Sequence, residues 1–433
     1  MAESCTSKSA SNTGRRSRFG CRECRKRRKK CDETRPSCQQ CLSRGFLCDY
    51  KRNDSNAIEK AYLPLQPKAP SPTGNSVQLV THFNSTVTNL LCFSPETTGG
   101  SLASYVLPLV SNSELVYTAV EALSAAHLFN RGLVRLNLAR NLHTSTLSIL
   151  ATALGHADFA KDLETILATI VLLIYYEIVL GNSLSSAYTH LKGAKVVLAS
   201  FCGTQLSPDA LFFVSILQYF DVIVAFSLQQ RPLGFVSGLS KDVQGASEVD
   251  AVYGLTKSLW PKLETLAKLR ASELRHTATH EQLEECEASL INWDVEWPML
   301  QITGQEDQAE QEAVLQIARL HKYSALTILY SDFEDAFSII RGPSRFQDRR
   351  AAVYQRALES LLRVCVLSTT VSTVLWPLYV VSMQAQSAND RVLLDKVFSR
   401  VLERQSMKVV SAARDTILQR WRRADKGPLP LLG

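Results

Sequence analysis

The sequence lacks the features that would direct the chain into or across a membrane. Residues Met1 to Thr13 are polar and rich in serine, without the apolar core of a secretory signal. We therefore expect a reducing compartment in which the eleven cysteines remain thiols. The most apolar stretch, Ile166 to Tyr176, stops at Glu177, well short of the roughly 20 residues that cross a bilayer. This stretch and Ala210 to Leu228 are predicted to be buried helices, and no membrane partner is expected.

Patterns typical of sheets, repeats and catalytic sites are also missing. No stretch alternates apolar and polar residues over a length that would predict a sheet, and no segment recurs at a fixed period. No constellation of residues points to catalysis, so we do not expect an enzyme. His276 and His280 are four residues apart, but they lack the adjacent glutamate of a zinc protease helix, and the threonine-rich stretch between them suits a helix poorly. We interpret this pair as polar surface.

Positive charge is concentrated in one short segment. From Arg15 to Arg52 the chain holds fourteen Lys or Arg and four Asp or Glu, whereas the other 395 residues hold 34 Lys or Arg and 37 Asp or Glu. A basic module on a nearly neutral body is typical of a protein that binds a polyanion, because neutralising phosphates releases counterions. The charge distribution therefore predicts a nucleic acid as the partner.

Six cysteines lie in this basic segment, in two C-x2-C pairs that are each followed, after six other residues, by a further cysteine. The 28 residues from Cys21 to Cys48 have too few apolar side chains for a core and need a metal or disulfides to fold. Tetrahedral zinc takes four ligands, so six thiolates can complete two zinc ions only if two sulfurs bridge. A disulfide-bonded knot and a zinc site without a role in DNA binding are the alternatives. We predict two Zn²⁺ per chain, with the ligands Cys21, Cys24, Cys31, Cys38, Cys41 and Cys48.

The stretch from Gly20 to Cys38 resembles the fungal binuclear zinc cluster transcription factors and matches their pattern at every cysteine. The resemblance implies a turn at Pro36 between the two halves, often with a cis peptide bond. It also implies a zinc-dependent, sequence-specific regulator that binds double-stranded DNA at RNA polymerase II promoters in the nucleus. By this likeness Cys21 and Cys38 bridge, so that one zinc takes Cys21, Cys24, Cys31 and Cys38 and the other takes Cys21, Cys38, Cys41 and Cys48.

Six consecutive cations, Arg25 to Lys30, lie between two of these cysteines. We predict a short helix whose ends are held by zinc ligands, since six like charges would destabilise a free helix. In the resembled family the end of this helix enters the major groove and reads a CGG triplet. Arg28 is the first expected base reader and Arg27 the second, because an arginine can form two hydrogen bonds with N7 and O6 of guanine. The alternative for the run is a nuclear localisation signal or a solvated surface alone. Contacts to phosphate are expected from Arg22, Arg25, Lys30 and Arg44.

Composition divides the chain into five parts. A flexible basic arm at residues 1–20 precedes the cluster at 21–48 and a linker at 49–75, in which prolines recur. Residues 76–425 have helical apolar spacing with short breaks and predict one large all-α domain, followed by a tail at 426–433. The linker has no heptad repeat, so any homodimer must form through the helical domain.

Apolar periodicity predicts the helices of this domain, together with a glycine-rich surface loop from Arg231 to Gly254. Ser113 is expected to cap the second helix, which should stop near Gly132. The predicted helices are 77–91, 113–129, 134–154, 158–180, 186–199, 208–228, 261–275, 281–293, 308–333, 348–367, 375–386 and 390–421.

The helical domain also resembles the fungal-specific transcription factor domain, through Leu115 to Leu128 and Ala187 to Ala194. This likeness implies a regulatory domain that in some relatives responds to a ligand. Two functions therefore stay open: a regulator of a metabolic or secondary-metabolite gene set, and a receptor whose helical domain binds a small-molecule effector and controls the DNA-binding module.

Aromatic residues that could line a ligand pocket are interpreted as core: Trp293, Trp297, Tyr323 and Tyr330. Acidic residues that could form an activation surface are interpreted as a solvated face: Glu281, Glu284, Glu285 and Glu287. The isolated cysteines Cys92, Cys202, Cys286 and Cys365 are expected to be small buried residues.

Overall fold

The protein is helical in the residues that its computed structural model describes. The β pairing within them is limited to an isolated bridge between Asp250 and Gly254, so the predicted mostly α fold is confirmed. The chain divides into two compact units, residues 1–66 and residues 67–433. The described residues are 21–34, 38–44, 74–93, 101–155, 162–201, 205–235, 249–271, 275–295, 305–367 and 374–423.

The first unit has two short helices and no apolar core among its described residues. Helix α1 (Arg22–Lys26) begins directly after Cys21, and α2 (Gln39–Leu42) begins directly after Cys38. Five cysteines make up its buried cluster. The basic arm at 1–20, Pro36, Cys48 and most of the linker lie outside the described residues.

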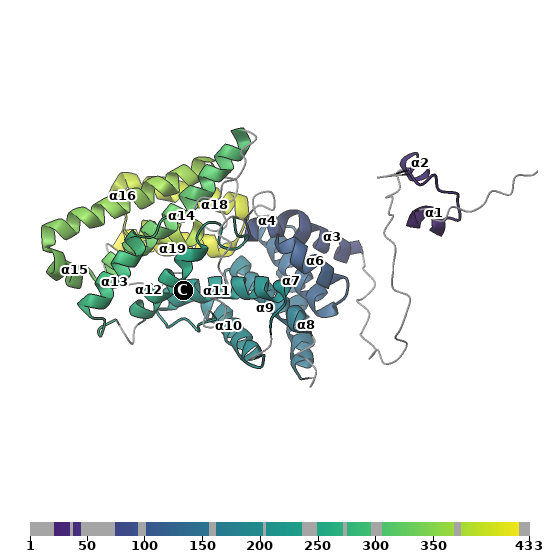
Figure 1. Cartoon of the computed structure of the whole chain (residues 1–433), viewed down its shortest axis with the longest axis horizontal. Helices are drawn as coiled ribbons and strands as arrows, with labels where there is room; N and C mark the ends of the chain where they lie inside the picture. The colour runs from purple at the N-terminus through teal and green to yellow at the C-terminus, as the bar shows by residue number, and fades with distance from the viewer. Residues whose placement is uncertain are drawn as a thin grey trace, which may run out of the picture. The chain divides into compact units, whose positions relative to one another are not determined.

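The second unit is a bundle of helices around a hydrophobic core that runs from Leu79 to Ile417. The longest helices, α14 and α16, lie side by side along one edge of this unit (Figure 1). The order of elements is α3 (Gly74–His82), the π-helix η1 (Phe83–Val87), α4 (Thr88–Leu91), α6 (Leu102–Val110), α7 (Glu114–Asn130), α8 (Leu136–Leu154), α9 (Leu163–Leu180), α10 (Leu184–Ala199), α11 (Pro208–Leu228), the 3₁₀ turn η3 (Lys257–Leu259), α12 (Trp260–Arg270), α13 (His280–Ile291), α14 (Gln305–Asp332), α15 (Glu334–Arg341), α16 (Pro343–Leu367), α17 (Leu375–Met383), α18 (Ala388–Gln405) and α19 (Lys408–Arg423).

Helices α9 and α11 supply the interior of this unit. Each is long and apolar enough to span a membrane by length and composition, but 78% of the most apolar window of α9 and 67% of that of α11 are buried inside the unit. Helix α9 packs against α7, α10 and α11, and α11 also packs against α12. The prediction of buried helices for these two stretches is therefore confirmed.

The ends of the helices differ from prediction where single residues turn the chain. Ser113 caps α7 as expected, because its hydroxyl accepts a hydrogen bond from the Val116 N–H at 3.3 Å. The single helix predicted at 390–421 is wrong: Ser406 adopts a left-handed φ of 50° and separates α18 from α19. Helices α6 and α15 were not predicted, and α16 begins at Pro343, earlier than expected. Helix α12 ends at Arg270, so the extension to 275 was also wrong.

The predicted surface loop from Arg231 to Gly254 is wrong for its described ends, at 231–235 and 249–254. The Asp221 carboxylate on α11 accepts hydrogen bonds from the N–H groups of Leu233 and Gly234, both at 2.8 Å. Tyr253 is buried, and its hydroxyl donates to the Ser215 carbonyl at 2.8 Å. At Gly254, with φ of 57°, a Cβ would lie 2.6 Å from the Phe93 ring. Both ends of this segment are therefore fastened to the core.

The side chains considered for a ligand pocket or an activation surface divide between the core and the surface of the helical unit. Trp293 and Tyr330 are buried, and Tyr323 is half-buried, whereas Trp297 lies outside the described residues. Glu281, Glu284 and Glu285 are exposed as predicted. The prediction was wrong for Glu287, which is buried, forms an ion pair with Arg349 at 3.1 Å and accepts a hydrogen bond from the Tyr330 hydroxyl at 2.5 Å.

Two of the isolated cysteines, Cys92 and Cys286, follow the expectation of burial. Cys92 and Cys286 are buried, and burial raises the pKa of each thiol to about 12. Cys365 is half-buried, and Cys202 lies outside the described residues. These thiols are packing residues rather than ionised ligands.

Candidate metal centre and nucleic-acid interface

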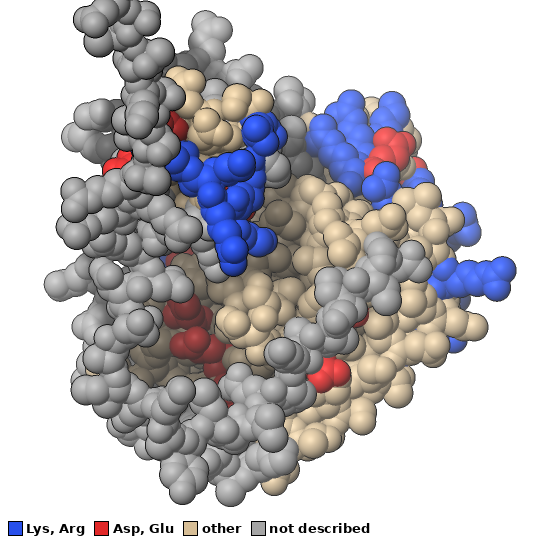
Figure 2. All heavy atoms as spheres, turned by 90° about the vertical axis from the view of Figure 1, so that its right-hand side faces the viewer, with Lys and Arg blue, Asp and Glu red and all other residues tan. Residues whose placement is uncertain are grey.

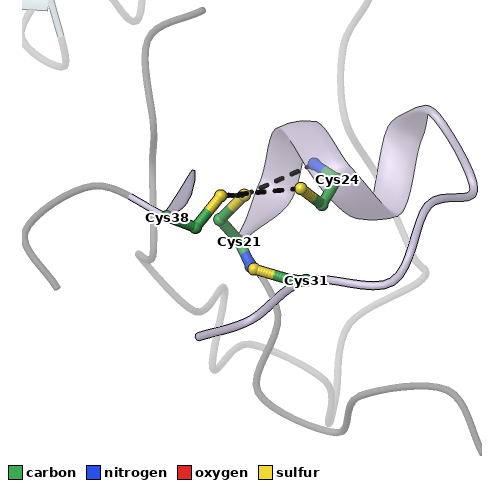
Figure 3. A group of neighbouring side chains, drawn as sticks. All are labelled: Cys21, Cys24, Cys31 and Cys38. Carbon is green, nitrogen blue, oxygen red and sulfur yellow. Dashed lines mark hydrogen bonds between the residues drawn. The ribbon is translucent and has the colours of Figure 1, made fainter. Parts of the chain in front are cut away.

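Five cysteine sulfurs converge in the first unit. The sulfurs of Cys21, Cys24, Cys31 and Cys38 lie within 4.8 Å of one another and face a common volume (Figure 3). The Cys41 sulfur lies 3.6 Å from that of Cys21. All five are buried and free of disulfides. Cys21 directly precedes α1 and Cys24 lies within it. In the same way, Cys38 directly precedes α2 and Cys41 lies within it. The two C-x2-C pairs are therefore brought together by matching helical turns.

Close contacts between sulfurs join the two halves of this segment. The Cys21 sulfur lies 3.7 Å from that of Cys38, and the Cys24 sulfur lies 3.6 Å from that of Cys38. Four sulfurs at about 2.3 Å from a tetrahedral zinc are about 3.8 Å apart, whereas disulfide sulfurs are about 2.0 Å apart. The observed distances match edges of metal–thiolate tetrahedra. Cys21 and Cys38 each approach a cysteine of the opposite pair, as bridging ligands must.

Backbone N–H groups surround these sulfurs. The N–H of Cys24 donates to the Cys21 sulfur, and the N–H groups of Cys21 and Glu33 donate to the Cys31 sulfur, each at 3.4 Å. Such hydrogen bonds stabilise thiolate charge. Burial raises the pKa of Cys21 and Cys24. Burial also opposes ionisation of Cys38, but hydrogen bonds, led by the Cys41 N–H, lower its pKa to about 6. A divalent cation is the group that would make the buried thiols ionise together.

Asp32 ties the loop after Cys31 to the second half of the segment. Its carboxylate accepts hydrogen bonds from the Gln39 N–H, at 3.1 Å, and from the Thr34 hydroxyl. The Thr34 bond and backbone N–H groups lower the pKa of Asp32 to about 2. Sequence reasoning missed this residue, because cysteine spacing gives no sign of how the loop between the halves is closed.

The cationic run from Arg25 to Lys30 is only partly helical, which corrects the prediction of one short helix. Helix α1 ends at Lys26, and Arg28 adopts a left-handed φ of 54°. The Lys29 N–H then donates to the Cys24 carbonyl at 2.9 Å, a bond that closes the end of the helix. The six like charges are therefore divided between a helix end, a turn and two residues without regular structure, so they do not all repel along one helix.

Three of the six predicted DNA-contacting side chains are exposed in the part of the chain that the structure describes. Arg28, Lys30 and Arg44 are exposed, and Arg27 is half-buried. Arg22 and Arg25 lie within α1. On the face of the molecule drawn in Figure 2, Lys and Arg gather in a few groups rather than being spread evenly, and few Asp or Glu are visible. The exposed cations next to the cysteines form a surface suited to phosphate.

Two family models match the chain. The fungal Zn(2)-Cys(6) binuclear cluster domain matches residues 19–57, and the fungal specific transcription factor domain matches residues 78–431. Both resemblances drawn from the residues are therefore confirmed. These are families of transcription factors rather than of enzymes, and the matched cluster is one that binds two zinc ions.

Curated relatives match mainly over short segments. The Zn(2)-C6 fungal-type transcription factor afumD of Aspergillus fumigatus is 39% identical over 77 residues, which are 16% of this chain and 21% of that protein. A transcriptional regulatory protein of Neurospora crassa is 60% identical over 38 residues, 9% of this chain and 6% of that protein. A lysine biosynthesis regulatory protein of Saccharomyces cerevisiae is 52% identical over 40 residues, 9% of this chain and 5% of that protein. The chain thus spans about a fifth or less of the length of these relatives. No solved structure matches the chain significantly.

Proposed function

The chain belongs to the fungal transcription factors that combine a Zn(2)-Cys(6) binuclear cluster with a fungal-specific transcription factor domain, and from this premise we propose that it is a zinc-dependent, sequence-specific DNA-binding regulator of transcription. The observation that carries this proposal is the convergence of cysteine sulfurs at 3.6 to 3.7 Å directly beside an exposed cationic turn. Bound metal would fold a peptide that lacks an apolar core, and the cationic turn after α1 would contact DNA.

The proposed zinc ligands are the six cysteines of the cluster. Cys21 and Cys38 bridge; Cys24 and Cys31 complete one zinc site, and Cys41 and Cys48 complete the other. The contacts of Cys21 with Cys38 and Cys41, and of Cys24 with Cys38, support this assignment because each joins two ligands of the same proposed zinc. When bound, zinc supplies positive charge and tetrahedral geometry, while the backbone N–H groups around Cys21 and Cys31 orient their sulfurs.

Arg28 is the proposed reader of guanine in a CGG half-site, with Arg27 second. The exposure of Arg28 in the turn after α1 supports this order, since Arg27 is half-buried. A bidentate contact between arginine and guanine is worth about 1 to 3 kcal/mol of discrimination. Arg22, Arg25, Lys30 and Arg44 would bind phosphates and fix the orientation of the module without selecting a sequence.

The proposed setting is the nucleus, at RNA polymerase II promoters of a metabolic or secondary-metabolite gene set. The name of the Saccharomyces cerevisiae relative, a lysine biosynthesis regulator, supports a metabolic target set. A homodimer, where one forms, would use the helical domain.

An alternative role as a ligand-responsive receptor has one specific observation in its favour. A cavity of about 360 Å³ in the helical unit is lined in part by Arg140, Tyr176 and Lys408. Its cationic lining would select a small anionic effector. A shift in the thermal unfolding midpoint of the chain with small organic acids would support this role, and DNA affinity that is unchanged by such a ligand would remove it.

The direct test of the proposed function compares Arg28→Ala and Lys30→Ala on a CGG-containing duplex and on random duplex DNA. We expect Arg28→Ala to weaken binding to the CGG duplex about 10- to 100-fold and to leave binding to random DNA nearly unchanged, since about 1.4 kcal/mol corresponds to a factor of ten. Lys30→Ala should weaken both equally and reduce the salt slope by about one. Equal losses on both duplexes for Arg28→Ala would remove it as a base reader.

A further inference from the structure

Three helices of the second unit bring two histidines and a glutamate to one point. His143 lies on α8, Glu177 on α9 and His190 on α10, and one ligand atom of each lies within 4.8 Å of the others. The His143 Nε2 atom lies 3.4 Å from Glu177 Oε1, and the His190 Nε2 atom lies 3.6 Å from the same oxygen. Both imidazoles therefore face a single carboxylate oxygen.

Glu177 is an unusual residue for its position. It lies near the end of α9, whose other buried residues are almost all apolar, and its side chain is 7% exposed. A buried carboxylate is costly unless it is paired and hydrogen-bonded. Its second oxygen, Oε2, is held by the Asn182 side chain, which donates to it at 2.6 Å. This contact leaves Oε1 directed at the two histidines.

The turn after α9 is built so that Asn182 reaches Glu177. Gly181 has a φ of 65°, and a Cβ on it would lie 2.8 Å from the backbone carbonyl carbon of Lys408. Only glycine fits this close approach without displacing the start of α19. The Asn182 N–H also donates to the Glu177 carbonyl at 3.0 Å, so the chain folds back tightly at this point. Backbone conformation and packing thus fix the orientation of the carboxylate.

The His143 ring is held in place, and its Nε2 atom faces the Glu177 carboxylate. The ring stacks on Tyr176 with centroids 4.2 Å apart and an angle of 8° between the planes. Its Nε2 atom is buried and lies 3.4 Å from Glu177 Oε1, but without the geometry of a hydrogen bond. A buried polar nitrogen that faces a carboxylate without a well-formed hydrogen bond is only partly satisfied. An ion between His143, His190 and Glu177 would satisfy it.

Distances and ligand types at this point fit a transition metal. Ligand atoms at about 2.0 to 2.1 Å from a tetrahedral zinc are about 3.4 Å apart, close to the 3.4 and 3.6 Å observed here. Two histidines and one carboxylate are a common ligand set that leaves further positions on the metal open. We propose that His143, Glu177 and His190 bind one Zn²⁺ ion in the helical domain.

The remaining ligand of this ion comes from an adjoining cavity of about 360 Å³. His143, Tyr176 and Asn182 line it, together with Arg140 and Lys408. The two cations favour a small anion, or a water that has lost a proton, in the open position. This site goes beyond the proposed function, because it adds a third zinc ion in the second unit and does not depend on DNA binding.

Zinc content of the full chain tests the site. The protein is equilibrated with buffered Zn²⁺, and bound zinc per chain is counted by mass spectrometry. We expect three zinc ions in the wild type and two in the double variant His143→Ala, His190→Ala. The matched control is His276→Ala, His280→Ala, two exposed histidines four residues apart, which should keep three. Two zinc ions in the wild type, or three in the site variant, would overturn the proposal.

Glu177→Gln with cobalt in place of zinc resolves the case in which the double alanine variant does not fold. This substitution keeps the size of the side chain and one acceptor oxygen, while it removes the charge and replaces the other oxygen with an N–H₂ donor. Cobalt bound by thiolates shows an intense near-ultraviolet charge-transfer band, whereas cobalt bound by nitrogen and oxygen shows only weak visible bands. We expect a third equivalent of cobalt to add visible absorption without the thiolate band in the wild type and not in Glu177→Gln. The same third equivalent in Glu177→Gln would refute the site, while the thiolate band reports on the cluster separately.

Discussion

The two units of this chain bury different kinds of side chain. In the first unit, the described buried cluster consists of five cysteines, whereas in the second unit a core of Leu, Ile, Val, Phe, Ala and Tyr runs through the helices. Apolar burial stabilises a fold by about 25 cal/mol for each Å² removed from water. The first unit has almost none of this contribution among its described residues, so its shape depends on metal–thiolate bonds. Folding of one unit should therefore be separable from folding of the other.

Charged residues divide between the units in a similar way. In the second unit several buried charged side chains are paired, as in Glu287 with Arg349 and Arg270 with Asp332. In the first unit Arg28 and Lys30 are exposed, and no ion pair among the described residues includes them. Paired charges in the second unit stabilise the fold, whereas the exposed cations of the first unit, Arg28 and Lys30, are accessible to a partner such as DNA.

Cys38→Ser should have the largest effect and should be confined to the first unit. Cys38 is a proposed ligand of both zinc ions, and structural zinc contributes about 10 to 16 kcal/mol to folding in small zinc domains. We expect loss of specific DNA binding in fluorescence anisotropy and an unchanged unfolding midpoint of the helical unit in calorimetry. Cys286→Ala, at a buried cysteine of the second unit, should do the reverse. Retained specific binding in Cys38→Ser would contradict a metal-built first unit.

Phe213→Ala should affect only the second unit. Phe213 is fully buried on α11 and packs edge-on against Tyr105. Removing a buried phenylalanine side chain costs about 3 to 5 kcal/mol, which urea denaturation of the helical unit would measure. Val196→Ala, at a side chain that is 69% exposed, is the control and should change stability by less than about 0.5 kcal/mol. A fall in DNA affinity per folded molecule would show that the two units are energetically coupled.

The helical unit should also lose stability on acidification through His321. This residue is buried between Trp260 and Trp376, and its Nδ1–H donates to the Ile317 carbonyl at 2.8 Å. Burial lowers the pKa of His321 from 6.5 to about 4, although the bond to Ile317 opposes this shift. Below pH 6.5 the unfolded chain takes up a proton that the folded state resists, so stability is full above pH 6.5 and falls until about pH 4.

The size of this acid effect is on the order of 3 kcal/mol, since each unit of pKa corresponds to about 1.4 kcal/mol. Urea denaturation of wild type and His321→Phe between pH 7 and pH 4 would measure it. We expect a shallower pH dependence in the variant. Exposed His276→Ala should leave the profile as in the wild type. An identical profile in His321→Phe would mean that other groups cause the acid sensitivity.

The sequence predicts best those features that depend on local spacing or on strong apolar composition. The cysteine spacing predicted the cluster because metal ligands so close in sequence have few ways to meet. The apolar runs of α9 and α11 predicted core helices for a similar reason. The break at Ser406 could not be predicted, because one left-handed residue interrupts a helix without disturbing the apolar pattern on either side. The turn at Arg28 could not be predicted either, because six consecutive cations have no apolar spacing that would mark the end of a helix.

The site at His143, Glu177 and His190 was beyond prediction from sequence. Its residues lie on three helices and form no motif, and their meeting depends on how α8, α9 and α10 pack. The one local signal was a glutamate that interrupts an apolar run. Such a carboxylate needs a partner, but the sequence does not say which.

The smallest expected effect is at Arg28, where the contribution of the backbone conformation and that of the side chain can be measured separately. A left-handed conformation costs an L-residue other than glycine about 1 to 2 kcal/mol. Arg28→Gly relieves this cost and Arg28→Ala retains it, while both remove the guanidinium group. If the side chain reads guanine, both variants should lose a similar 1 to 3 kcal/mol of discrimination between CGG and random duplexes, measured by anisotropy at fixed salt. If the turn itself positions neighbouring cations, both variants should keep most of this discrimination, and Arg28→Gly, which adopts the turn without the cost, should keep at least as much as Arg28→Ala. The first outcome would make the strained turn a support for one base-reading side chain, and the second would assign recognition to the shape that zinc gives the whole segment.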